Sequence, residues 1–462
     1  MQKMQRLRMQ FSPGADSFGL SDHPWLAPWE QDEVIKVLLR YGLIKFDNKR
    51  NLPLKGGGVT DIYINLRQAR RHPPTLGFIA DLFANPLRRM GAEQFYEIPD
   101  SVSCFAGLIA DRTSLPYLTL REKAKEGRVA KADYIGEAAP GERVAGIDDV
   151  ITDGESKAAP HFKARSMGLS ILPFVVLVDR QQGWKQKFRE LGIDVGVWPG
   201  MTLHDVRRYL IMNGLMERCS AQAEANNRMI VAVDNQADWE DVLTLLDPLR
   251  PTGSIIKFND VIFNLGIKDL LPKAQVYGRV MADLKSHDIE NTVRNITKHL
   301  LPCPPWAVTV HASGNSDMVK AAVETLRGTP TKVLAVTVLT SLKAGPNGTC
   351  EEVYRRQPLT AVKGLSKLAM RGGADGFVCS PEETPMLRGL YPQSIIVNPG
   401  TRSPGVDKHD QARVDTPANA LRRGANFFVS GRQVLNAPNP VLEVIRVHRD
   451  ELHIDLGLDQ KK

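Results

Sequence analysis

A group of charged residues in the carboxy-terminal half of the sequence has the composition of a catalytic site. Asp283 and Lys285 lie in the run Met281-Ala-Asp-Leu-Lys-Ser-His-Asp-Ile-Glu-Asn-Thr292, which also contains Asp288. The apolar run before Asp283 predicts a strand, and residues two apart on a strand point to the same face. An ammonium group beside a carboxylate could stabilise a developing negative charge and donate a proton. A charged strand end without a catalytic role is the alternative for this motif on its own.

The sequence from Met229 onward predicts the element that positions this motif. Strand-like runs alternate with helical segments, which favours a (β/α)₈ barrel with its site at the carboxyl ends of the strands. The expected strands are Met229–Asp234, Ser254–Asn259, Val280–Lys285, Ala307–Ala312, Val333–Leu339, Gly376–Ser380, Ser394–Val397 and Phe427–Ser430. The polar residues near those ends are Asp234, Lys257, Asp283, Lys285, His311, Thr340, Ser341, Arg402 and Arg432, and Gly431 precedes the last of them. Ordinary surface charge would be scattered over both ends of a barrel, so this placement indicates a site.

The length of the chain indicates more than one domain. A chain of 462 residues is expected to form roughly two or three domains. We expect an irregular arm over residues 1–28 and an α/β domain with a mainly parallel sheet over residues 29–218. A small polar linker over residues 219–228 then leads into the barrel over residues 229–462. The predicted fold class is therefore α/β throughout.

Composition and charge restrict the class of protein. With 42% hydrophobic and 24% charged residues, we expect a soluble globular protein. We expect no membrane association, because no apolar run approaches the ~20 residues that span a bilayer and the basic amino terminus is unlike a signal peptide. Five scattered cysteines without a CxxC pair indicate free thiols in the cytoplasm and argue against a zinc site. The net charge of +8 is spread along the chain without interleaved aromatic residues, which favours small anionic ligands over nucleic acid.

Two segments of the amino-terminal half combine a strand with a glycine-containing loop. The run Arg143-Val-Ala-Gly-Ile-Asp-Asp-Val-Ile-Thr-Asp-Gly-Glu-Ser-Lys157 leads from an apolar strand into a loop and a helix. Backbone N–H groups of such a loop, around Thr152 and Gly154, can hold a phosphate at the start of the helix. The run Leu52-Pro-Leu-Lys-Gly-Gly-Gly-Val-Thr-Asp-Ile-Tyr-Ile-Asn-Leu-Arg67 is a glycine-rich turn before an alternating strand, which is also typical of a hairpin.

The pattern Asp-x-Lys-x-x-Asp-Ile-x-x-Thr resembles the signature of orotidine 5'-phosphate decarboxylase of the bacterial type. Further matching segments follow in order, and they are Val310-His-Ala-Ser-Gly-Asn, Val336-Thr-Val-Leu-Thr-Ser341, Pro399-Gly-Thr-Arg402, Asp410-Gln411 and Ser430-Gly-Arg432. The resemblance implies decarboxylation of orotidine 5'-phosphate (OMP) to UMP in pyrimidine synthesis, without a cofactor or a metal. The catalytic residues that it implies are Lys257, Asp283, Lys285 and Asp288. The substrate-binding residues that it implies are Asp234, Thr292, Thr340, Ser341, Arg402, Gln411, Gly431 and Arg432.

The resemblance also implies a partner. Decarboxylases of this pattern are homodimers through the barrel, and Asp288 would reach into the site of the partner subunit, with OMP and UMP as the ligands. A more remote alternative is a sugar-phosphate decarboxylase or aldolase, which shares the Asp-x-Lys-x-x-Asp strand but acts on a metal-bound enediolate. Lys257 and the pair Thr340-Ser341 favour the nucleotide.

The amino-terminal segments resemble orotate phosphoribosyltransferase, and the whole chain then resembles a UMP synthase. The residues that this resemblance places at the transferase site are Lys55, Tyr63, Arg121, Lys125, Asp148, Asp149, Thr152 and Gly154. Such a domain would use Mg²⁺ together with phosphoribosyl diphosphate (PRPP). Three carboxylates, those of Glu122, Asp153 and Glu155, depart from the pattern because they lie where the phosphate groups would bind. We therefore expect weak or absent transferase activity, and the alternative is a fully bifunctional enzyme that converts orotate to UMP.

Overall fold

The computed structural model describes residues 24–48, 52–53, 59–99, 101–120, 134–346, 348–405 and 415–458. The chain divides into two compact units, Met1–Met216 and Glu217–Lys462. Four predicted site residues lie outside the described residues, and these are Lys55, Arg121, Lys125 and Gln411. Within the described ranges, no helix combines the length and the apolar character needed to cross a bilayer.

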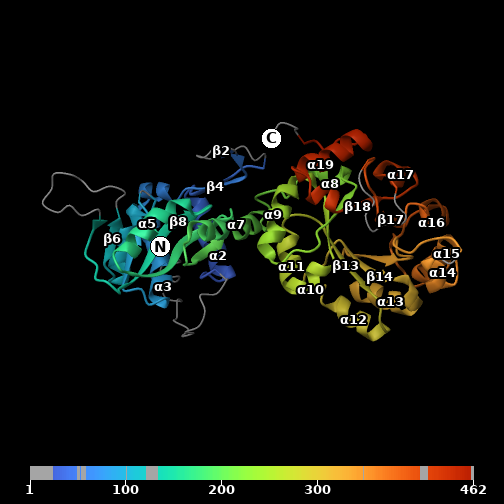
Figure 1. The fold of residues 1–462 in the computed structure, drawn as a ribbon, viewed down its shortest axis with the longest axis horizontal. Coiled ribbons are helices and arrows are strands. Elements are labelled where there is room, and N and C mark those ends of the chain that lie inside the picture. The colour runs from blue at the N-terminus through green and yellow to red at the C-terminus, as the bar shows by residue number, and fades with distance from the viewer. Residues whose placement is uncertain are drawn as a thin grey trace. The chain divides into compact units, whose positions relative to one another are not determined.

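The amino-terminal unit is built on a six-stranded sheet in the order β10-β9-β8-β5-β6-β7 (Figure 1). Neighbouring strands are parallel, except that β7 runs antiparallel to β6 at one edge. The strands are β5 (Gln94–Glu97), β6 (Tyr117–Leu120), β7 (Tyr134–Ile135), β8 (Arg143–Ile151), β9 (Ser170–Asp179) and β10 (Val197–Thr202). This sheet confirms the predicted α/β class with a mainly parallel sheet.

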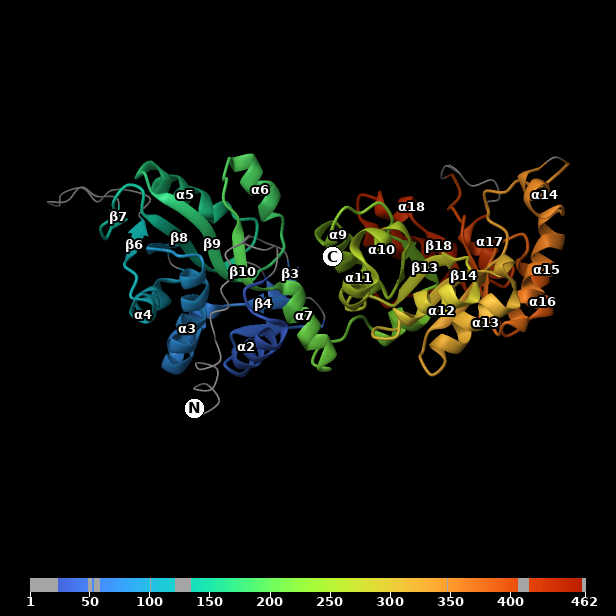
Figure 2. The ribbon, with the colours of Figure 1, turned by 90° about the horizontal axis from the view of Figure 1, so that it is seen from below.

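Helices cover both faces of this sheet (Figure 2). Alternate residues of β9 point to opposite faces, so Val175 packs into one core and Phe174 into the other. The first core includes side chains of α2 (Pro28–Arg40), α3 (Pro73–Arg89), α4 (Ser103–Thr113) and α7 (Leu203–Met212). The second core includes side chains of α5 (Glu155–Ser166) and α6 (Trp184–Leu191). The remaining elements are β1 (Ile44–Phe46), β2 (Leu52–Pro53), β3 (Val59–Thr60), β4 (Ile62–Ile64) and η1 (Leu66–Arg71), in which β1 pairs with β4 and β2 with β3.

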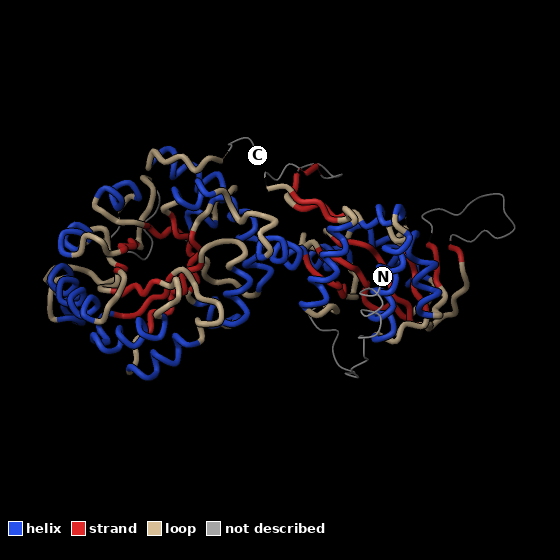
Figure 3. Tube along the Cα trace, turned by 180° about the vertical axis from the view of Figure 1, so that it is seen from behind, coloured by secondary structure: helices blue, strands red, loops and turns tan. Residues whose placement is uncertain are grey.

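The carboxy-terminal unit is a closed barrel of parallel strands that follow one another in chain order from β11 to β18, with helices around it (Figure 3). The strands are β11 (Met229–Ala232), β12 (Ile255–Phe258), β13 (Val280–Ser286), β14 (Ala307–His311), β15 (Lys332–Val336), β16 (Gly376–Val378), β17 (Ile395–Asn398) and β18 (Phe427–Ser430). The predicted barrel is therefore confirmed.

The helices of the barrel unit lie around the strands (Figure 3). They are α8 (Ala221–Asn226), α9 (Trp239–Leu249), α10 (Asp260–Leu265), α11 (Ile267–Ala274), α12 (Glu290–Lys298), α13 (Asn315–Leu326), α14 (Thr349–Tyr354), α15 (Pro358–Arg371), α16 (Thr384–Leu390), α17 (Pro417–Arg422), α18 (Arg432–Leu435) and α19 (Pro440–Arg446). Single turns lie at η2 (Arg250–Thr252), η3 (Ala312–Gly314) and η4 (Val447–Glu451). A separate apolar cluster joins side chains of different strands, among them Ile230, Ile255, Met281 and Leu334. The inward-facing residues of a small barrel fill its interior in this way.

Candidate active site

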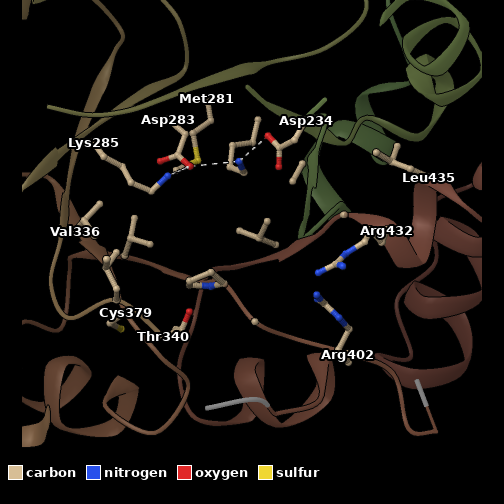
Figure 4. Close-up of a pocket in the computed structure, with 18 of the residues that line it drawn as sticks. Asp234, Met281, Asp283, Lys285, Val336, Thr340, Cys379, Arg402, Arg432 and Leu435 are labelled. Atoms are coloured by element: carbon tan, nitrogen blue, oxygen red, sulfur yellow. Dashed lines mark hydrogen bonds and ion pairs between the residues drawn. The ribbon is translucent and has the colours of Figure 1, made fainter. Parts of the chain in front are cut away.

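A cavity of about 510 Å³ lies at the carboxyl ends of the barrel strands (Figure 4). Its walls are formed by strand ends and by the segments that follow them. The cavity brings together a set of the predicted site residues, which are Asp234, Lys257, Asp283, Lys285, Thr340, Arg402, Gly431 and Arg432. These residues are far apart in the sequence, so their meeting depends on closure of the barrel.

Four of these side chains form a row of alternating charge. The Nζ atom of Lys285 lies 2.6 Å from Oδ2 of Asp283, and the Nζ atom of Lys257 lies 3.3 Å from the same oxygen. Lys257 also lies 3.3 Å from Oδ1 of Asp234. The Asp283 side chain is 8% exposed, whereas those of Lys285 and Asp234 are 35% and 42% exposed. The row therefore has a buried centre and two ends that a ligand can reach.

Asp283 stays ionised at neutral pH although it is buried. Burial raises the pKa of this carboxyl, but the charges of Lys257 and Lys285 and the hydrogen bonds from Lys285 and Thr309 oppose burial and prevail. The pKa of Asp283 therefore lies below its ordinary value. Two ammonium groups share this one carboxylate, so the three groups together carry a net positive charge, which suits an anionic ligand.

The backbone at Lys285 departs from the regular strand that the sequence suggested. Lys285 has a φ of 48°, in the left-handed region that side chains other than glycine rarely adopt, at a cost of about 1–3 kcal/mol. The pairing of β13 with β14 shifts register between Ala282 and Ser286. Asp283 and Lys285 both reach the cavity, as expected, but through an irregular strand end. The simple rule of alternation is corrected here.

Thr309 of β14 holds this irregular segment and was missed by sequence reasoning. Its hydroxyl donates a 2.8 Å hydrogen bond to Oδ1 of Asp283 and accepts a 2.9 Å hydrogen bond from the backbone N–H of Lys285. Asn259 adds a 2.5 Å hydrogen bond from its side-chain amide to the backbone carbonyl of Asp283. Thr309 is fully buried and lies two residues after Ala307, which packs into the barrel interior. Thr309 is a polar residue at an inward position of the strand that follows the motif strand, and this pattern could have identified it from the sequence.

Two arginines lie on the other side of the cavity from the charge row. Arg402 follows β17 and Arg432 is the first residue of α18, and their guanidinium groups point toward each other (Figure 4). The Nη1 atom of Arg402 donates a 2.7 Å hydrogen bond to the carbonyl of Thr401. Two guanidinium groups that face one space match the geometry of a phosphate. One end of the cavity therefore suits a phosphate, and the other carries the lysine–carboxylate row.

Three predicted residues do not line this cavity in a single chain. Asp288 and Thr292 lie beyond the end of β13, and the Asp288 carboxylate accepts a 2.7 Å hydrogen bond from the N–H of Ile289. Asp288 is exposed, as is Ser341, which follows the cavity residue Thr340. Other residues line the cavity although the sequence reasoning gave them no role in the site, and they include Asn235, Met281, Cys379 and Leu435.

The predicted transferase residues Asp148 and Asp149 lie on β8 and are 2% and 7% exposed. Lys157 of α5 forms a buried ion pair with Asp148, and its side chain is 3% exposed. Its Nζ atom also donates hydrogen bonds of 3.3 Å to the carbonyl of Val150 and 3.0 Å to Oγ of Ser156. Sequence reasoning gave Lys157 no role, although a lysine just inside a helix that follows two aspartates was visible.

The surroundings of Asp149 raise its pKa above the ordinary value. Burial, together with the neighbouring Asp148, raises the pKa of Asp149 to about 8, although Arg67 lies 3.8 Å from its Oδ2. Asp149 is therefore largely protonated at pH 7, and Lys157 balances the charge of Asp148. Tyr63 lies on β4 and Arg67 follows that strand closely. The contact of Arg67 with Asp149 therefore brings the segment that contains Tyr63 near the aspartates.

The loop before α5 keeps the form that the sequence suggested. Gly154 has a φ of 84°, and a Cβ atom there would lie 2.5 Å from the ring of Phe188, so a larger residue does not fit. Thr152 and Glu155 on either side of it are exposed. Within the described part of the chain, no group of three or more His, Cys, Asp or Glu residues is arranged to hold a metal ion.

Comparison with known proteins connects the barrel to a family. Residues 227–447 match the family described as "Orotidine 5'-phosphate decarboxylase / HUMPS family". The orotidine 5'-phosphate decarboxylase of Nitrosomonas europaea is 39% identical over 227 residues, which are 49% of this chain and 96% of that protein. That of Moorella thermoacetica is 38% identical over 226 residues, which are 47% of this chain and 89% of that protein. Among solved structures, UMP synthase of Leishmania donovani has 29% identity and a TM-score of 0.35, and the match covers 42% of this chain and 40% of that chain.

The fold and the cavity define a parallel barrel protein in which a lysine–carboxylate row lies across the site from two arginines. The chain covers nearly all of the N. europaea decarboxylase at 39% identity. It therefore belongs to the orotidine 5'-phosphate decarboxylase family. The residues that match the family lie within the unit Glu217–Lys462.

Proposed function

We propose that the barrel unit decarboxylates OMP to UMP, a step of pyrimidine nucleotide synthesis. The single observation that carries this function is the contact of Lys257 and Lys285 with one carboxylate oxygen of Asp283, in a cavity that also contains two arginines. A substrate with a carboxylate at one end and a phosphate at the other fits such a cavity. Membership of the decarboxylase family supports the same reaction.

The chemistry assigns a role to each group of the row. Loss of CO₂ breaks the bond at pyrimidine C6 and leaves its electron pair on that carbon, where no cofactor is needed if the protein stabilises the charge. The ammonium group of Lys285 stabilises this carbanion and gives its proton to C6. Asp283, ionised and buried, lies beside the substrate carboxylate and repels it, and departure of CO₂ relieves that repulsion. Lys257 offsets the charge of Asp283 on the other side.

The family resemblance assigns the substrate contacts, most of them to residues that line the cavity. Asp234 and Lys257 would bind the ribose hydroxyls, and Thr340 and Ser341 the pyrimidine. Arg402 and Arg432, with the backbone of Gly431 and with Gln411, would bind the phosphate. Loops after the seventh and eighth strands bind phosphate in many barrels of this type, which supports the assignment.

We further propose that the active form is a homodimer in which Asp288 reaches the site of the partner subunit. Two observations support this arrangement. Asp288 does not line the cavity of its own chain, and its side chain is exposed. The next residue, Ile289, is apolar and 71% exposed, so a partner surface that covered it would remove apolar area from water. The scattered cysteines support a cytoplasmic location.

For the amino-terminal unit we propose an orotate phosphoribosyltransferase-like domain with weak or absent activity. The parallel sheet, the aspartates of β8 and the glycine loop before α5 support the family resemblance. The ion pair between Lys157 and Asp148 and the carboxylate of Glu155 argue against efficient binding of PRPP with Mg²⁺. If the domain is active, the chain is a bifunctional UMP synthase.

One assay separates these functions. The purified chain is given OMP, or orotate with PRPP and Mg²⁺, and the formation of UMP or OMP is followed. We expect OMP turnover that EDTA does not abolish. Magnesium-dependent turnover of a sugar phosphate, without turnover of OMP, would instead identify a sugar-phosphate decarboxylase or aldolase.

A further inference from the structure

The two segments that carry the cavity arginines are joined by the residues that directly follow them. Ser403 comes after Arg402, and Gln433 comes after Arg432. The backbone N–H of Ser403 donates a 3.1 Å hydrogen bond to Oε1 of Gln433, and the amide of Gln433 donates a 2.6 Å hydrogen bond to Oγ of Ser403. We call this reciprocal pair the Ser403–Gln433 clamp.

The clamp is anchored to the last helix of the barrel. The Gln433 amide also donates a 2.8 Å hydrogen bond to Oε1 of Glu443, and Arg446 donates a 3.1 Å hydrogen bond to Oγ of Ser403. Arg446 in turn pairs with Glu443 at 2.7 Å. Ser403 is 4% exposed, so these bonds form in a partly dehydrated setting where they are stronger and more directional. Neither Ser403 nor Gln433 lines the cavity itself.

Such an anchor affects how the two cavity arginines can bind an anion. Two guanidinium groups that face the same cavity carry like charges, and both can contact one anion only if their backbones are held at a suitable spacing. Holding the two backbones together before the anion arrives reduces the rearrangement that binding must impose. Phosphate binding is therefore favoured by a contact that does not touch the phosphate.

We propose that Gln433 is a positioning residue, which through Ser403 sets the spacing of Arg402 and Arg432 for one phosphate monoester dianion. This inference rests on the proposed function because it takes OMP as the phosphate ester. Gln433 acts through its neighbours and does not touch the substrate. Its removal should weaken only those ligands that carry the phosphate.

The test compares ligands with and without phosphate on the full-length chain. Gln433→Ala removes both bonds of the clamp, whereas Ser403→Ala removes the hydroxyl but keeps the backbone bond. For Gln433→Ala we expect kcat/KM for OMP to fall about 10-fold to 100-fold, the range for two lost hydrogen bonds, with UMP binding weakened in parallel. The slow decarboxylation of orotidine, which lacks the phosphate, should change less than about twofold. Gln222→Ala, which removes a surface amide that bonds Asp455, is the matched control and should leave both substrates unaffected.

A double-mutant cycle adds a second readout. If the two residues act as one clamp, adding Ser403→Ala to the Gln433→Ala variant should lower kcat/KM for OMP little further. Equal losses of OMP and orotidine turnover in Gln433→Ala would show a general loss of structure and overturn the positioning role, as would unchanged UMP binding. Absence of OMP turnover by the wild-type chain would refute the proposed function alone. In that case calorimetry would compare the affinities of wild type and Gln433→Ala for UMP and for inorganic phosphate. Equal affinities in the two proteins would refute the positioning role of Gln433.

Discussion

The hydroxyl of Thr309 lies 2.8 Å from Oδ1 of Asp283, while both lysines of the charge row contact Oδ2. The same hydroxyl accepts the N–H of Lys285, whose backbone is in the left-handed region. Thr309 therefore links the two residues to which we assign the chemistry, and it does so from the neighbouring strand. The carboxylate and the ammonium group are held by the barrel wall as well as by their mutual attraction.

Replacement of Thr309 by valine should shift the acidic limb of the pH profile. Valine keeps the shape but loses the hydrogen bond that helps to lower the pKa of Asp283. The pKa of Asp283 should therefore rise toward its ordinary value, and the ionised form should be lost at a higher pH as pH falls. We expect the acidic limb of the pH profile of kcat/KM for OMP to move to higher pH. The plateau value of kcat/KM should fall about tenfold. Thr309→Ser keeps the hydroxyl and should restore the wild-type limb, and an unmoved limb in Thr309→Val would argue against this role.

Removal of the Lys285 ammonium should abolish decarboxylation without unfolding the barrel. Lys285→Ala deletes both the proton donor and the charge closest to Asp283, so kcat should fall at least ~10³-fold. Circular dichroism and thermal unfolding should show a folded protein. Lys320→Ala, which changes a lysine with a 60% exposed side chain, serves as the control and should retain full activity. Near-normal kcat in folded Lys285→Ala would remove Lys285 from the mechanism.

Mixing two inactive variants should restore activity if the site is shared between subunits. Asp288→Ala lacks the group proposed to come from the partner, and Lys285→Ala lacks the proton donor. In a mixed dimer one of the two sites contains neither substitution, so activity should return to at most about one quarter of wild type when subunits exchange at random. Exchange is followed with differently tagged chains. Efficient exchange without any return of activity would show that each site is complete within one chain.

The fold was accessible from the sequence because its signals are local and repeated. Each barrel strand is a short, mainly apolar run, and Phe427–Ser430 has the same bounds in the sequence and in the structure. Parallel pairing of β12 with β13 then brings Lys257 to Asp283 without any further information from the sequence. The parallel sheet of the amino-terminal unit followed from the same alternation of strands and helices.

The parts that the sequence did not reveal depend on contacts between segments. Lys285 has a φ of 48° at the point where the register of β13 against β14 shifts. No residue type near Lys285 in the sequence predicts this backbone conformation. The clamp between Ser403 and Gln433 joins two polar residues that look ordinary in the sequence. The pairing of Lys157 with Asp148 depends on how α5 packs onto β8. In each case a common polar residue gains its role from a partner that is distant in the sequence or from a packing angle.

The ion pair between Lys157 and Asp148 sharpens the expectation for the amino-terminal unit. A transferase site of this kind uses its aspartates to accept hydrogen bonds from ribose hydroxyls, but Lys157 already contacts Asp148, and Asp149 is largely protonated at pH 7 because burial raises its pKa to about 8. A bound ribose must displace an ammonium group that is itself buried. Glu155 adds a negative charge beside the loop that would receive the 5'-phosphate. A like charge a few ångströms away costs on the order of tenfold in binding at a protein surface.

We therefore expect the full-length chain to form OMP from orotate, PRPP and Mg²⁺ slowly or not at all, with OMP decarboxylation as the internal control for folded protein. Glu155→Thr should raise transferase turnover by removing the charge, and Lys157→Ala should raise PRPP binding further by freeing Asp148, in each case by about tenfold. Binding of PRPP with Mg²⁺ is measured by calorimetry and turnover by consumption of orotate. Asp153→Asn, which removes a charge from the same loop and leaves the ion pair intact, separates a general charge effect from the specific one. Rapid OMP formation by the wild-type chain would show that neither Lys157 nor Glu155 obstructs the site.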